Sequence, residues 1–156
     1  MAKPMERTWK TKQTTNEDLP LLLRYLTNLD FGAKSLEFPE LILITQHLAE
    51  VSDNGLPEPD YNDKLCDFDK AIQEAFEITK VGMTVLIETF AGKRNYYIYA
   101  IQDADVAKIL SNVLQQHPAH EITWSIHPDS TWSFIQKYAS QYGLQNEATN
   151  VGKMPT

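Results

Sequence analysis

The chain has 156 residues, and its 14 basic and 21 acidic side chains give it a formal net charge of −7. An acidic surface repels nucleic-acid phosphates and anionic lipids, so this charge disfavours direct binding to nucleic acid or to a membrane surface. No apolar run approaches the roughly 20 residues that a membrane-spanning helix needs. The single cysteine, Cys66, excludes an internal disulfide and a four-cysteine zinc site. We therefore expect a globular, cytoplasmic protein.

The first third of the chain predicts strands at residues 7–15, 19–27 and 41–48, where bulky or β-branched side chains follow one another over a short length. Residues 31–39 are interpreted as a loop. Residues 52–63 contain one glycine, two prolines and four carboxylates, and this composition predicts a loop and excludes a helix.

A helical period begins at Asp63, which we expect to act as the N-cap, and the helix ends near Gly82. Its apolar stripe repeats every three or four positions: Leu65, Phe68, Ile72 and Phe76. Residues 83–91 and 95–101 flank a turn at Gly92 and predict a β-hairpin.

The last third of the chain predicts a helix capped by Asp103, a strand at residues 122–126 and a final helix that Gly143 ends. Trp132 lies on the apolar side of that final helix, and we expect it to be buried against the sheet.

The predicted order is β-β-β-α-β-β-α-β-α, in which hairpins dominate over β-α-β alternation. This order predicts an α+β fold, with a mainly antiparallel sheet and helices packed on one face, in a ferredoxin-like sandwich. We expect a single domain over residues 7–143, with flexible tails at residues 1–6 and 144–156.

The histidines do not predict a metal site. His120 and His127 are separated by seven residues across a strand, so they face opposite sides of the sheet, and His117 with His120 alone would supply only two ligands. Cys66 lies among Asp63, Asp67 and Asp69, whose charges oppose the thiolate form, so we interpret it as an inert thiol. We expect neither a metal nor another cofactor.

Catalytic motifs are also missing from the sequence. It contains no phosphate-binding glycine-rich loop and no Gly-x-Ser-x-Gly elbow, and helix capping explains its paired carboxylates. The sequence assigns no catalytic residue and leans away from an enzyme. A hydrolase that uses His120, His127 or Asp129 stays open as an alternative.

Five residues are candidates for binding a partner. Tyr97 and Tyr99 share one strand face and would form a binding surface if helices cover only the other face, although tyrosines also simply suit strands. Arg94 follows the hairpin turn, where we expect it to be exposed and to form a weak surface ion pair. Glu58 and Asp60 belong to an acidic stretch, residues 50–69, that suits a basic partner unless it is merely a solvated surface.

Several landmarks occur together in a set order. They are Trp9, Gly55-Leu56-Pro57, Gly92-Lys93-Arg94 running into Tyr96-Tyr97, and Asp129-Ser130-Thr131-Trp132 followed by Phe134 and Tyr138. From about residue 9 to 142 the chain resembles the bacterial family of proteins of unknown function numbered 695. The family pattern would place an acidic residue after the hairpin arginine, whereas this chain has Asn95.

The resemblance implies no activity, because the family has none assigned. Domains of this family sometimes accompany domains similar to the regulator of ribonuclease activity B, and this association implies a regulatory role through protein binding. The sequence thus favours a non-enzymatic regulator or inhibitor, similar to an immunity protein or a ribonuclease regulator, whose partner is another protein. A structural module that forms a homodimer through Tyr97 and Tyr99 is a further alternative.

Overall fold

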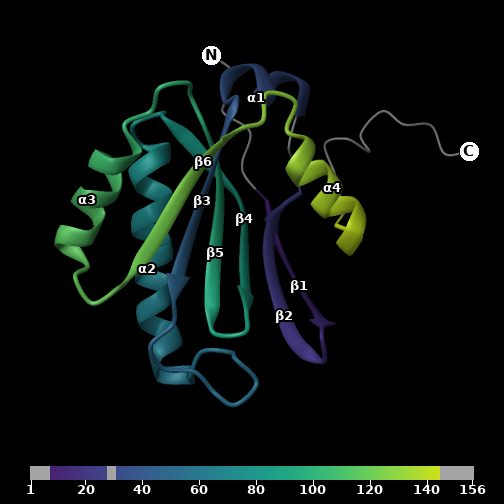
Figure 1. Cartoon of the computed structure of the whole chain (residues 1–156), viewed down its shortest axis with the longest axis vertical. Helices are drawn as coiled ribbons and strands as arrows, with labels where there is room; N and C mark the ends of the chain where they lie inside the picture. Colours follow the sequence, from purple (N-terminus) through teal and green to yellow (C-terminus); the bar gives the residue numbers. More distant parts are fainter. Residues whose placement is uncertain (1–7, 28–30, 145–156) are drawn as a thin grey trace, which may run out of the picture.

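The computed structural model of the protein describes residues 8–27 and 31–144. Within these residues the elements follow the order β1 (Trp9–Asn16), β2 (Leu19–Leu26), α1 (Phe31–Glu37), β3 (Glu40–His47), α2 (Pro59–Glu77), β4 (Gly82–Phe90), β5 (Lys93–Ala100), α3 (Val106–Gln116), β6 (Ile122–Pro128) and α4 (Ser133–Tyr142). The strands form one sheet in the order β1-β2-β4-β5-β3-β6, and every neighbouring pair is antiparallel (Figure 1).

The path from β3 to β6 has the β-α-β-β-α-β connectivity of a ferredoxin-like fold. Strand β4 lies two positions from β3 in the sheet, and β5 returns between them and pairs with both, so the sheet is antiparallel throughout. The β1–β2 hairpin extends this sheet past β4. The predicted α+β class and the antiparallel sheet are confirmed.

Helices lie on both faces of the sheet, whereas the sequence predicted one covered face (Figure 1). Helices α2 and α3 pack on one face, where Phe68 and Leu110 share a buried cluster with Ile98. Helix α4 packs on the other face, where Trp132 and Ile135 join a second cluster. Because both faces of the central strands are covered, β4 is apolar along most of its length and does not alternate.

Three local predictions were wrong. Residues 31–39 contain the short helix α1, which has no strong sequence signal because it spans only seven residues and includes Gly32. Helix α2 begins at Pro59, four residues before the predicted cap and within residues 52–63, where the sequence was predicted to exclude a helix. Proline is tolerated in the first turn, because its missing N–H has no helical partner to lose. The cap of α3 is Asp105, whose side chain accepts a hydrogen bond from the Lys108 N–H at 3.2 Å, and not Asp103.

Residues 1–6 and 145–156 of the predicted tails lie outside the described residues. Leu144, the first residue of the predicted C-terminal tail, is partly buried against the cluster beneath α4. Within the described part of the chain, no helix is both long enough and apolar enough to cross a membrane.

Candidate functional site

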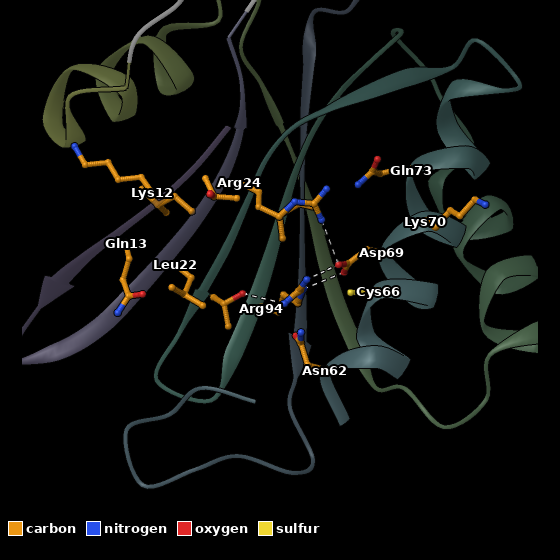
Figure 2. A pocket seen from close by; sticks show the side chains of 14 residues that line it. Lys12, Gln13, Leu22, Arg24, Asn62, Cys66, Asp69, Lys70, Gln73 and Arg94 are labelled. Atoms are coloured by element: carbon orange, nitrogen blue, oxygen red, sulfur yellow. Dashed lines mark hydrogen bonds and ion pairs between the residues drawn. The ribbon is translucent and has the colours of Figure 1, made fainter. Parts of the chain in front are cut away.

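A pocket of about 690 Å³ opens between α2 and the β1–β2 hairpin, and we call it the hairpin cleft. It arises because α2 covers the central strands but not β2 and β1, which extend the sheet beyond the helix (Figure 1). Its floor comes from β2, β4 and β5, and one wall comes from α2. Figure 2 shows Arg24, Asp69 and Arg94 pointing toward one another in this cleft.

The deepest part of the hairpin cleft holds a buried ion pair between Asp69 of α2 and Arg94 of β5. The Arg94 Nε donates to Asp69 Oδ1 at 2.9 Å, and a second Arg94 nitrogen donates to Asp69 Oδ2, so the pair is bidentate. A third nitrogen donates to the Thr89 hydroxyl at 3.2 Å. Burial disfavours the charge on Arg94, but the Asp69 carboxylate outweighs it and raises the pKa of the guanidinium above its ordinary value.

A chain of polar side chains continues from this pair beneath α2. The Tyr96 hydroxyl lies 2.5 Å from Asp69 Oδ1 and 3.1 Å from Gln46 Oε1. Gln46 Nε2 in turn lies 2.7 Å from His120 Nδ1. Burial and the adjacent Asp69 carboxylate raise the pKa of Tyr96 well above its usual range, so the hydroxyl keeps its proton.

Arg24 of β2 faces Asp69 in the hairpin cleft and is partly open to solvent. Its side chain is 39% exposed, and its nearest nitrogen lies 3.7 Å from Asp69 Oδ2, which is an ion-pair distance longer than a hydrogen bond. The guanidinium lies 5.4 Å from the centre of the Trp9 ring, which supports it by a cation–π contact. Two guanidinium groups thus face one carboxylate, which leaves a net charge of about +1 at the cleft floor, on a chain of net charge −7.

Two further cations line the cleft, and their amines have partners other than Asp69. Lys12 donates a hydrogen bond to the Tyr142 carbonyl, and its amine points toward α4 (Figure 2). Lys70 is mostly exposed and lies 3.9 Å from Glu74 along α2. Neither amine is paired with the Asp69 carboxylate.

The rim of the cleft supplies neutral hydrogen-bonding groups and one thiol. Gln13, Asn62 and Gln73 bring side-chain amides, and Leu22 brings apolar surface. Cys66 is exposed at the same rim. Such a surface suits a ligand that combines an anionic group with a partly polar body.

Residues 7–138 match the family described as a family of unknown function, DUF695. The chain belongs to this family. No curated protein and no solved structure matches it. The matched residues include the whole of the hairpin cleft, so the cleft is part of the DUF695 domain.

The exposed position predicted for Arg94 was wrong. The residue is 6% exposed, because β5 turns its side chain under α2 and onto Asp69 rather than outward from the hairpin. The predicted ion pair exists, but it is buried and joins residues 25 positions apart instead of lying on the surface. Asn95, the departure from the family pattern, donates to Glu88 at 2.7 Å on the opposite strand of the hairpin.

Tyr97 and Tyr99 face away from α2, but α4 covers them. Tyr97 stacks on Phe134 with ring centres 5.1 Å apart, and Tyr99 stacks on Trp132 at 4.1 Å. Both tyrosines are buried, so neither is available to a partner or to a second copy. Burial raises the pKa values of both hydroxyls above their ordinary range, with Glu88 adding to the effect at Tyr97 and Asp129 at Tyr99.

Glu58 and Asp60 are exposed at the start of α2. The loop before them is tied to the β4–β5 turn, since Gly92 N–H donates to the Gly55 carbonyl at 2.9 Å and Leu48 N–H donates to the Gly92 carbonyl at 3.0 Å. These two carboxylates therefore stand on an ordered scaffold.

The residues proposed for a hydrolase are engaged in separate places. Asp129 accepts hydrogen bonds from Tyr99 and from the first turn of α4, His127 lies against Ser125, and His120 stacks on Phe68. None of the contacts among the described residues joins these three side chains. Within residues 8–27 and 31–144, no group of three or more histidine, cysteine, aspartate or glutamate side chains could bind a metal.

The sequence analysis missed Asp69 and Arg24 as site residues, although a signal for each was present. Asp69 follows Leu65 by four positions and precedes Ile72 by three, so it lies on the apolar stripe of its helix. Arg24 interrupts an apolar strand in the same way. A charged residue on a buried face needs an opposite charge, and that rule would have assigned a cation to Asp69 and a carboxylate to Arg24.

Proposed function

We propose that this DUF695 protein is a binding protein whose hairpin cleft accepts an anionic group, a carboxylate or a phosphate, on Arg24. The observation that supports this function is the saturation of Asp69. Both oxygens of that carboxylate accept hydrogen bonds from Arg94, and Tyr96 adds another. Arg24 therefore keeps its planar fork of donors available, and such a fork matches the oxygens of a carboxylate or phosphate.

The test is a titration with inorganic phosphate and with small mono- and dicarboxylates, followed by NMR on the Arg24 and Trp9 side-chain N–H signals. Arg24→Ala should weaken binding by about tenfold or more, since a hydrogen bond to a charged group contributes about 1.5–3 kcal/mol. Lys70→Ala is the matched control, because this lysine lines the cleft but pairs with Glu74 in solvent. Equal affinities for the two variants and the native chain would exclude the cleft as an anion site.

Cys66 gives an independent measure of occupancy, because it is the chain's single thiol and lies at the cleft rim. A ligand in the cleft should slow the reaction of the Cys66 thiol with a bulky maleimide in the native protein. The same ligand should have no effect on this reaction in Arg24→Ala.

A second candidate function is the regulator of a basic protein, such as a nuclease or a toxin. The observation that favours it is the exposure of the carboxylates at residues 50, 53, 58, 60, 63 and 67, on and after the anchored loop. Opposite charge on a partner would speed association and make it sensitive to salt.

To test this second function, the native chain is used to capture a partner from the source cell at low and at physiological salt. The double variant Glu58→Lys with Asp60→Lys should fail to capture it. Glu74→Lys, near the other end of α2, is the control and should keep it. Capture that ignores the charge reversal would exclude this surface.

A further inference from the structure

We propose that two copies of this chain form a symmetric dimer by pairing strand β6 with β6 of the second copy. The β6 edge is separate from the hairpin cleft. The sheet has two edge strands, β1 and β6. Proteins normally protect an edge strand with charged residues, and β1 carries Lys10 and Lys12. Strand β6 has the sequence Ile-Thr-Trp-Ser-Ile-His-Pro and carries no lysine, arginine or carboxylate.

The open side of β6 presents unused backbone groups. The Asp129 N–H donates to Pro39 and the Glu121 carbonyl accepts from His47, so the odd-numbered residues of this segment bond toward β3. Backbone groups alternate in direction along an antiparallel strand. The N–H and C=O groups of Ile122, Trp124 and Ile126 consequently point outward from the sheet edge.

The same residues expose apolar side chains. Trp124 is 42% exposed and Ile126 41%. Beside them a shallow groove of about 390 Å³ runs between β6 and α3, and its lining, which includes Leu110 and Leu114, holds no charged residue. Two chains of net charge −7 can therefore approach here without bringing like charges into contact.

The sequence of this segment fits a second copy of itself. In an antiparallel pair centred on Trp124, each Ile122 faces Ile126 of the second copy, and each Thr123 faces Ser125. Apolar side chains thus meet on the face that carries α2 and α3, and hydroxyls meet on the other face. At each end Glu121 faces His127, which sets a carboxylate opposite an imidazole. A two-fold axis requires this self-complementarity, and a foreign peptide would match it only by coincidence.

The outward-pointing residues also favour one centre for the pairing. An axis at Thr123 would place Ile126 opposite His120 of the second copy, and an axis at Ser125 would place Ile122 opposite Pro128, which has no N–H. An axis at Ile122 would place Trp124 opposite His120 of the second copy, and an axis at Ile126 would place it opposite Pro128. Both shifts move the ladder past the end of the strand. Only the axis at Trp124 uses all three outward-pointing residues, each facing pair exchanging two hydrogen bonds.

Size-exclusion chromatography with light scattering tests the dimer. The native chain should have twice the single-chain mass of 17.8 kDa. Trp124→Lys places two ammonium groups at the axis, and its mass should fall by half while circular dichroism shows a folded chain. Leu36→Lys is the control, because Leu36 is 86% exposed on α1, and it should stay dimeric. A native chain that is monomeric at every concentration, or a dimeric Trp124→Lys, would overturn the proposal.

Disulfide cross-linking tests the register without depending on a destabilised variant. In a Cys66→Ser background, Trp124→Cys should form a covalent dimer under mild oxidation, since facing Cα atoms lie about 5.5 Å apart. Ile126→Cys should not, because its two copies would lie four residues out of register, at about 13 Å. Equal cross-linking of both variants, or of neither, would exclude this pairing.

Discussion

Arg94 and Asp69 meet under α2 as a buried bidentate pair, although one comes from a strand after a hairpin turn and the other from the middle of a helix. Asp69 is 2% exposed and Arg94 is 6% exposed, so each charge is compensated mainly by the other. Removing one partner from such a pair leaves the other charge buried without compensation. The position of α2 over the sheet is thereby tied to the floor of the hairpin cleft.

Arg94→Met should therefore destabilise the protein by about 3–5 kcal/mol, measured by urea unfolding. The double variant Arg94→Met with Asp69→Leu should lose less stability than Arg94→Met alone, because it leaves no buried charge in this pair. Arg24→Ala serves as the comparison and should cost less, since the Arg24 side chain is 39% exposed. A loss below about 1 kcal/mol in Arg94→Met would match a surface pair instead.

Trp132→Ala should cost about 3–5 kcal/mol in a thermal or chemical melt. The predicted burial of Trp132 is confirmed, since its side chain is 0% exposed, stacks on Tyr99 and donates to the Phe38 carbonyl at 2.7 Å. Phe134→Ala, in the first turn of α4, is the control and should cost less, because Phe134 is 36% exposed. Similar losses for the two variants would show that Trp132 does not anchor α4.

Gly55→Ala should destabilise the protein more than Gly92→Ala. Both glycines have a positive φ, +84° and +81°, at which a side chain costs about 1–2 kcal/mol. A Cβ at Gly55 would also lie 2.7 Å from the Ala91 Cα, whereas a Cβ at Gly92 meets nothing within 4 Å. Chemical unfolding of both variants measures the difference, and equal losses would mean that the acidic loop does not pack on the hairpin turn.

Acidification should weaken the fold through His120. Burial and the neighbouring His117 lower the pKa of His120, and Asp69 opposes this only in part. The unfolded chain therefore binds the proton more readily than the folded one. The contribution of His120 to the free energy of unfolding is fully present above the unfolded pKa of about 6.5, and it is lost as the pH falls from there toward the lower pKa of the folded state.

The measurement is the urea midpoint at about pH 7.5 and about pH 5.5, on either side of the ordinary histidine pKa. His120→Gln should reduce the loss of stability between these two conditions. His47→Gln, at the exposed end of β3, should leave the loss unchanged. An unaltered pH dependence in His120→Gln would show that another group causes it.

The local sequence was enough to predict most of the elements. The Gly92 turn between two apolar runs predicted the β4–β5 hairpin, and the stripe from Leu65 to Phe76 predicted most of α2. These signals depend on neighbours within a few positions, so they can be read without knowing the packing. Helix α1 had no such signal, and one of its anchors is distant: the carbonyl of Phe38, the residue that follows it, accepts from the Trp132 indole, 94 positions away.

The sequence by itself pointed to one of the three central charged residues of the candidate site, Arg94, and only the tertiary structure decided which residues it meets. Asp69 and Arg24 lie on apolar faces of their elements, a signal that went unused, and Arg94 was placed beside a turn. Nothing local specified that α2 would cross the sheet so as to bring all three together, because that arrangement depends on sheet order. Likewise the sequence showed three neighbouring tyrosines, and the docking of α4 decided that Tyr97 and Tyr99 became core residues rather than a surface.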